Sequence, residues 1–146
     1  MPIIRADVPD WATRAQMAEL RVELHSCIER TWAREHIWVA VRGMYAEPGD
    51  ATVILTVDLR DGRGQESERT RALFEESLDV CNRILGTTDE RLILLVRKFG
   101  QDECISGGDG LPPLAELTPE LRRSGQRKNR VAVNAGASSG PINQSK

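Results

Sequence analysis

The sequence has 146 residues, of which 40% are hydrophobic and 29% charged, and its formal net charge is -2 at pH 7. These values are typical of one globular domain with a hydrophobic core. A net charge so close to zero gives no general attraction to nucleic acid or to an anionic membrane. We therefore expect neither partner. The longest apolar runs, such as residues 92–96, are far shorter than the roughly 20 residues that cross a bilayer.

Three cysteines, Cys27, Cys81 and Cys104, are widely spaced and form no CxxC pair. Their odd number and their spacing argue against a disulfide framework and against a structural zinc site. A reducing, intracellular setting is the simpler interpretation. The first residues are too short an apolar run for a signal peptide. We expect a cytoplasmic protein without a bound metal.

The first half of the chain alternates between strand and helix patterns. Residues 2–8 are a short β-rich run, which Pro9-Asp10-Trp11 interrupts. Thr13 and Gln16 have the spacing of a capping box. Apolar side chains then recur at helical spacing: Met17, Leu20, Leu24, Cys27 and Ile28. Residues 37–41 predict a buried strand, and residues 47–50 predict a turn.

The second half repeats this order. Residues 52–59 predict a strand, which Asp61-Gly62 ends. Gly86 is the expected C-cap of the helix that follows. One face of this helix is marked by Leu73, Phe74, Ser77, Leu78, Cys81, Ile84 and Leu85. Residues 92–96 predict a second buried strand, and a glycine-rich segment follows at 100–110.

The pattern is β-α-β twice over, with a repeat of roughly fifty residues, which is too few copies for a solenoid. Right-handed crossovers make each β-α-β unit parallel and place both helices on one face of a shared sheet. We therefore predict an α/β (α+β) fold with one four-stranded sheet over residues 2–112, in units of about 2–50 and 51–112. The other face of the sheet would be apolar and bare, which implies an oligomer.

The character of the chain changes from about Ala115. Residues 113–146 lack apolar periodicity, and we predict a disordered, partly basic tail. A basic tail could contact nucleic acid, but no aromatic residues are interleaved with its cations, so a solubilising end is the favoured interpretation. The basic cluster consists of Arg122, Arg123, Arg127, Lys128 and Arg130.

Three sets of residues resemble a known family. Pro2-Ile3-Ile4 directly follows Met1, Arg60-Asp61-Gly62-Arg63 follows the third predicted strand, and Cys104-Ile105-Ser106-Gly107-Gly108 follows the last one. With the paired β-α-β units, they resemble the tautomerase superfamily, whose simplest member is 4-oxalocrotonate tautomerase. More narrowly, the chain resembles the fused, double-length branch that includes cis-3-chloroacrylic acid dehalogenase. The resemblance covers about residues 2–112.

The resemblance implies that Pro2 is the catalytic base of a tautomerase that needs no cofactor and assembles as a trimer. Aminopeptidases remove Met before a small second residue, which leaves a secondary amine. A free α-amino group titrates near pH 8, and apolar neighbours and arginine charges disfavour its charged form. Such a base can take a proton from the carbon beside a carbonyl. The alternative is that Pro2 only governs the removal of Met1.

Arg60 and Arg63 flank a glycine that permits a tight turn. Guanidinium groups bind carboxylates in a bidentate manner and stabilise an enolate oxygen. The resemblance implies that both arginines hold the carboxylate of a small keto or enol acid near Pro2. The alternative is that they form surface ion pairs with Asp58 or Asp61.

Other polar residues are weaker candidates. Tyr45 is a candidate proton donor, because a hydroxyl held in a network can donate a proton. His25 and His36 are better explained as structural residues. Asp58 lies between apolar strand positions and faces either the site or solvent. Arg42 ends a strand and is a candidate to reach the pocket of a neighbouring subunit.

The chain departs from the dehalogenase branch at the residues that activate water there. By ungapped alignment the helix histidine of that branch falls on Ile28, the tyrosine falls on Leu95, and the glutamate falls near Ser106, with Glu103 close by. These departures argue against hydrolytic dehalogenation. Two alternatives to a tautomerase remain: a Pro-dependent dehalogenase, hydratase or decarboxylase of a three-carbon acid, and a non-catalytic assembly partner with the same fold.

Overall fold

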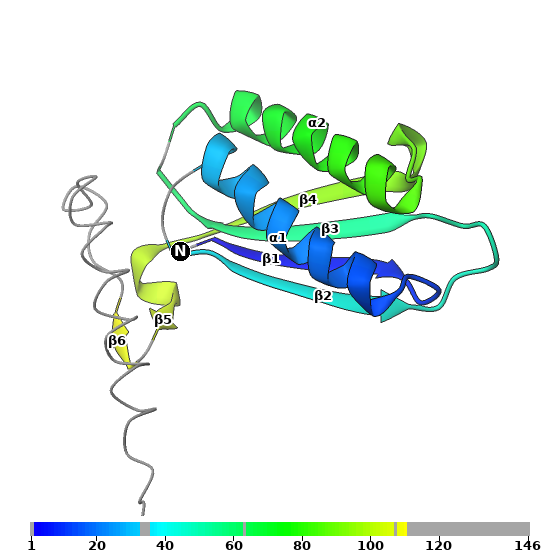
Figure 1. Cartoon of the computed structure of the whole chain (residues 1–146). Helices are drawn as coiled ribbons and strands as arrows, with labels where there is room; N and C mark the ends of the chain where they lie inside the picture. Colours follow the sequence, from blue (N-terminus) through cyan, green and yellow to red (C-terminus); the bar gives the residue numbers. More distant parts are fainter. Residues whose placement is uncertain (1, 33–35, 63, 107, 111–146) are drawn as a thin grey trace, which may run out of the picture. The chain divides into compact units, whose positions relative to one another are not determined.

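A computed structural model describes residues 2–32, 36–62, 64–106 and 108–110 of the chain (Figure 1). The predicted tail at 113–146 lies outside these ranges. The main elements in chain order are β1 (Ile3–Pro9), α1 (Arg14–Thr31), β2 (Trp38–Met44), β3 (Val53–Arg60), α2 (Glu66–Leu85) and β4 (Leu92–Phe99). Two 3-10 turns, Asp89–Arg91 and Gln101–Glu103, and the short strands β5 (Ile105–Ser106) and β6 (Asp109–Gly110) complete the described elements.

The four long strands form one sheet in the order β2-β1-β3-β4. β1 and β2 are parallel, β3 and β4 are parallel, and the two pairs meet where β1 runs antiparallel to β3. Both helices lie on the same face of this sheet (Figure 1). The predicted fold class, two β-α-β units that share a four-stranded sheet, is confirmed.

Local signals in the sequence set the ends of the helices. Thr13 and Gln16 form the predicted capping box, in which each side chain bonds to the backbone N–H of the other residue. Gly86 ends α2 with a φ of 77°, in the left-handed region that favours glycine. Within the described ranges, neither helix is long and apolar enough to cross a membrane.

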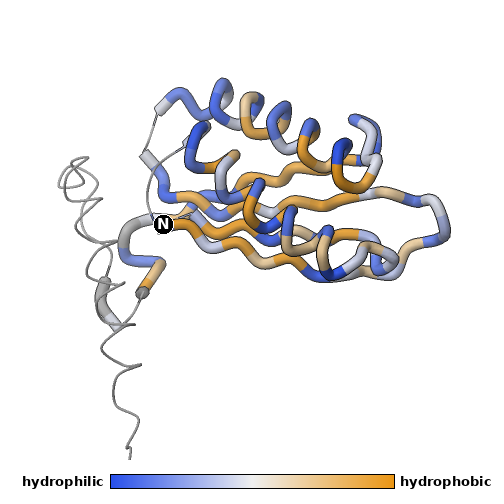
Figure 2. The backbone as a smooth tube through the Cα atoms, in the orientation of Figure 1, coloured by the Kyte–Doolittle hydropathy of each residue, from blue (hydrophilic) through white to orange (hydrophobic). Residues whose placement is uncertain are grey.

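The hydrophobic core lies between the helices and the sheet. Every second strand residue points toward the helices, and in β1 and β3 these residues are at most 1% exposed: Ile4, Ala6, Val8, Val53, Leu55, Val57 and Leu59. Figure 2 shows hydrophobic stretches along the strands below the helices. α1 contributes Leu20, Leu24, Cys27 and Ile28 to the same core. This burial is the main stabilising term that holds the two units together.

The opposite face of the sheet, here called the open face, is not the bare apolar surface that we predicted. On the central strand β3, Asp58 accepts hydrogen bonds from Arg5 (2.9 Å) and from Arg97 (2.9 and 3.1 Å). Strand alternation places these charged residues on the face without helices. Exposed apolar side chains flank them: Trp38, Ile93 and Leu95 are 52%, 51% and 52% exposed. The open face is therefore mixed, with paired charges between apolar flanks.

Candidate active site

Pro2 lies at the start of β1, a central strand of the sheet, and less than 2% of its surface is exposed. Its carbonyl accepts a hydrogen bond from the backbone N–H of Trp38 at 3.0 Å. This bond ties the start of β1 to the start of β2. The ring nitrogen of Pro2 is thus held at one end of the sheet, against a packed core.

Arg60 ends β3 at the same end of the sheet. The antiparallel register pairs Ile3 with Asp58, and one further step of that register sets Pro2 opposite Leu59, next to Arg60. Only 4% of Arg60 is exposed. Burial lowers the pKa of its guanidinium, and nearby Cys104 acts in the opposite direction. Because arginine keeps its charge at neutral pH, a buried cation lies at the same end of the sheet as Pro2.

Two further residues lie around Arg60. Phe99 is its partner in the register with β4 and is partly buried. Its carbonyl accepts the N–H of Asp61 at 2.9 Å. Cys104, also partly buried, interacts electrostatically with Arg60. The sequence analysis cited Cys104 only within a motif. The electrostatic contact adds its thiol to the surroundings of Arg60.

The other two predicted site residues do not join this pair in one chain. Arg63 lies outside the described residues. Tyr45 follows Met44, which pairs with Pro9 at the far end of β1, so it lies at the opposite end of the sheet from Pro2. It is 80% exposed and donates a hydrogen bond to Glu47 at 2.9 Å, which raises the pKa of Tyr45. A proton donor at Tyr45 would have to serve the site of another chain.

The weaker candidates have identifiable surroundings. His25 lies on α1 with Glu29 at 3.8 Å. Arg42 pairs with Asp7 on the open face. His36 precedes β2, and its ring meets that of Trp38 edge-on, with the centroids 5.2 Å apart. The parallel pairing of the first β-α-β unit could have indicated from the sequence that His36 lies at the same end of the sheet as Pro2.

The positions that correspond to the water-activating residues of the dehalogenase branch have other roles here. Ile28 is completely buried in the core, and Leu95 is half exposed on the open face. The Glu103 carboxylate accepts the backbone N–H of Gly100 at 2.9 Å. Among the residues that the structure describes, no group of three or more potential metal ligands occurs.

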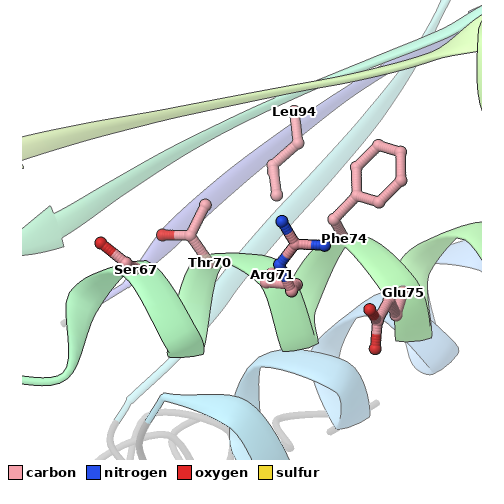
Figure 3. A pocket seen from close by; sticks show the side chains of 6 residues that line it. All are labelled: Ser67, Thr70, Arg71, Phe74, Glu75 and Leu94. Carbon is pink, nitrogen blue, oxygen red and sulfur yellow. The ribbon is translucent and has the colours of Figure 1, made fainter.

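A hollow of about 550 Å³ lies at α2 and β4, away from the residues considered so far. Figure 3 shows Thr70 and Phe74 extending from the helix toward Leu94 of the strand. Its complete lining is Ser67, Thr70, Arg71, Phe74, Glu75 and Leu94. None of these is a predicted site residue, so the candidate active site remains the end of the sheet at Pro2 and Arg60.

No protein-family model and no curated protein matches the sequence. Solved structures do match the fold. A wild-type fused 4-OT, a symmetric trimer, aligns with a TM-score of 0.66 at 17% identity, over 80% of this chain and 99% of that one. A member of the cis-3-chloroacrylic acid dehalogenase family gives 0.65 at 15% identity, over 86% and 99%. A malonate semialdehyde decarboxylase gives 0.59 at 17% identity, over 72% and 90%.

These similarities show that the chain has the fold of the tautomerase superfamily. More particularly, the chain has the double-length form of that fold, in which one polypeptide carries both β-α-β units. The resemblance noted in the sequence is thus confirmed for the fold.

Proposed function

We propose that this protein is a cofactor-independent tautomerase that moves a proton within a small 2-keto or 2-hydroxydienoate acid, with Pro2 as the general base. The observation that carries the proposal is the burial of Pro2 and Arg60 at neighbouring strand ends. Met1 is removed from the mature protein, so the ring nitrogen of Pro2 becomes a free secondary amine.

The surroundings of Pro2 suit a base that is neutral near pH 7. An α-amino group titrates near pH 8 in water, and both desolvation and a nearby cation disfavour its protonated form. The neutral nitrogen takes a proton from the carbon beside the substrate carbonyl and returns it elsewhere. Arg60 binds the substrate carboxylate and stabilises the charge that develops on the enolate oxygen. Arg63 is the second anion-binding residue of the proposal.

We further propose a cytoplasmic homotrimer assembled through the open face. Its exposed apolar residues Trp38, Ile93 and Leu95 support burial against other copies, and the similar fused 4-OT is a symmetric trimer. In such an assembly Tyr45 acts as the proton donor only if a neighbouring chain brings it to Pro2. Light scattering coupled to size-exclusion chromatography checks this, because a monomer contradicts it.

A second reaction class is supported by one observation, the similar fold of a malonate semialdehyde decarboxylase at a TM-score of 0.59. The same amine, in its protonated form, would then promote hydration or decarboxylation of a three-carbon acid. Malonate semialdehyde and 3-chloroacrylates should therefore be assayed beside phenylpyruvate and 2-hydroxymuconate. Activity on the first pair alone selects the second class. Silence on all four substrates would indicate a non-catalytic assembly partner.

Replacing Pro2 tests the proposed base. We expect P2A to lower kcat/KM for the keto–enol exchange of phenylpyruvate or the ketonisation of 2-hydroxymuconate by about 100- to 10,000-fold, the usual contribution of a general base. P48A is the matched control, because Pro48 lies exposed in the turn after β2. Intact-mass analysis of both proteins shows whether Met1 is absent. Unchanged turnover in P2A, or retention of Met1 in the active wild type, refutes the assignment.

A further inference from the structure

His36 and Pro2 lie at the same end of the sheet because β1 and β2 are parallel. The register pairs Ile3 with Trp38, and the N–H of Trp38 bonds to the carbonyl of Pro2 at 3.0 Å. One step back along both strands sets Ile37 beside Pro2, and His36 lies one residue beyond. The imidazole therefore starts from a backbone position adjacent to the proposed base.

The strand order places Pro2 between two functional side chains. β1 lies between β2 and β3, so His36 approaches Pro2 from one side and Arg60 from the other. Neighbouring strands lie about 4.8 Å apart, which separates the two flanking backbones by about 10 Å. A small carboxylic acid whose carboxylate is bound by Arg60 spans the start of β1 and extends toward His36.

Both flanking side chains belong to the open face. His36 precedes β2, and its ring meets that of Trp38, an exposed residue of the open face, edge-on with an interplanar angle of 71°. Strand alternation puts Arg60 on the face of Asp58. The helix side is filled by core residues such as Ile4 and Leu59. Pro2 is in phase with Ile4, so its ring packs on the helix side, and in the proposed site the substrate meets its nitrogen at the end of β1, between His36 and Arg60.

We infer that His36 is a second acid–base residue of this site, which exchanges a proton with the carbonyl oxygen of the substrate. The inference rests on the proposed function and extends it. Imidazole is the side chain suited to this role, since it gains and loses a proton between pH 5 and 8. The edge-on contact with Trp38 helps to hold the ring in place.

The other charged side chains named on the open face pair with one another or bind the substrate, so the imidazole is the group that exchanges the proton. On β1 and β4, Arg5 and Arg97 are both bonded to Asp58 of β3. On β2 itself, Arg42 pairs with Asp7 of β1. Arg60 of β3 remains cationic and binds the carboxylate of the substrate. Cys104, the other ionisable side chain near Arg60, lies on the Arg60 side of Pro2.

In the proposed step, the nitrogen of Pro2 removes a proton from the carbon beside the substrate carbonyl. The C–H electron pair forms a carbon–carbon double bond, and the carbonyl electrons move to oxygen. The imidazolium of His36 donates its proton to that oxygen and becomes neutral. Pro2 then loses its added proton to water while His36 takes one up, so the step consumes neither oxidant nor reductant. The reverse direction follows the same path.

The test measures kcat and KM of full-length wild type, H36Q, H25Q and P2A from pH 5 to 9. H25Q is the matched control, since His25 is the other histidine of the chain and lies on α1. We expect H36Q to lower kcat by about 100-fold with KM changed less than about threefold, and to lose the alkaline limb of the pH profile. H25Q keeps the wild-type profile.

The possible outcomes separate this inference from the proposed function. If H36Q retains the wild-type kcat and pH profile while P2A is inactive, His36 has no acid–base role and the Pro2 proposal stands. If P2A is as active as the wild type, the proposed function fails, and the role of His36 fails with it. Should H36Q fold poorly, NMR titration of the two histidines in wild-type protein replaces it. Cinnamate should then shift the titration of His36 but not of His25, and an unshifted His36 overturns the inference.

Discussion

The two ends of the sheet occupy equivalent positions in the duplicated fold, yet they carry different chemistry. Because β1 and β3 are antiparallel, the start of the first unit and the start of the second lie at opposite ends. Pro2 precedes β1, and Thr52 precedes β3. At a repeat of fifty residues, the position of Arg60 at the end of β3 corresponds to Asp10 after β1.

The end at Thr52 is built for turn stability. The N–H and the hydroxyl of Thr52 both donate to the carboxylate of Asp50, at 3.0 and 2.6 Å, and these bonds lower the pKa of Asp50. Arg91 lies 3.7 Å from the same carboxylate. The nitrogen at this position is an amide, which cannot act as a base. Although the β-α-β unit occurs twice, each chain therefore has only one position at which a free N-terminal amine is proposed.

The largest expected effect distinguishes the arginines of the two ends. R60A removes the buried cation beside Pro2, and we expect kcat/KM to fall by about 100- to 1,000-fold, as for other groups that stabilise an oxyanion. R91A removes a cation from the end at Thr52 and is expected to leave kcat/KM unchanged. Steady-state kinetics on the substrate that P2A fails to convert provide the measurement. Equal losses in the two variants would contradict the difference between the ends.

The two helices, in contrast, resemble each other, because each buries one cysteine. Cys27 of α1 and Cys81 of α2 are both completely buried. Burial raises the pKa of the Cys27 thiol from 9.0 to about 11 and that of Cys81 to about 12. The folded state thus holds these protons more tightly than the unfolded state. The contribution of these two thiols to the free energy of unfolding is fully present below pH 9. It decreases as the pH rises through 9 toward 11 and 12.

Urea unfolding at pH 8.0, 9.5 and 10.5 measures this dependence. We expect the free energy of unfolding to fall over this series, and to fall less steeply in C27A/C81A than in the wild type. At pH 8.0 a thiol reagent should label Cys104, which is partly exposed, well before the two buried cysteines. Rapid native labelling of Cys27 or Cys81 would show that the helix layer is not packed as described.

The smallest expected effect concerns stability at the end of α2. Gly86 has a φ of 77°, and a Cβ added there would meet no atom within 4 Å. The cost of G86A is therefore backbone strain alone, about 1–2 kcal/mol. Thermal unfolding should report this loss while kcat/KM stays at the wild-type value. A large loss of activity in G86A would mean that the site depends on this distant end of the fold.

The sequence by itself determined the elements and their ends. Apolar spacing identified both helices and all four strands, and Thr13, Gln16 and Gly86 marked the helix ends where the structure has them. These signals are local, because each depends on residues within a few turns or on alternation within one strand. The sequence also predicted Pro2 and Arg60 as site residues through a motif resemblance.

Only the tertiary structure decided which of the candidates meet. The register of β1 with β3 sets Arg60 at the same end of the sheet as Pro2, while the register of β1 with β2 sets His36 at that end and Tyr45 at the opposite one. The same pairings set Arg5, Asp58 and Arg97 together on a face predicted to be apolar. Strand order and register are contacts between residues far apart in the chain, so no local pattern specifies them.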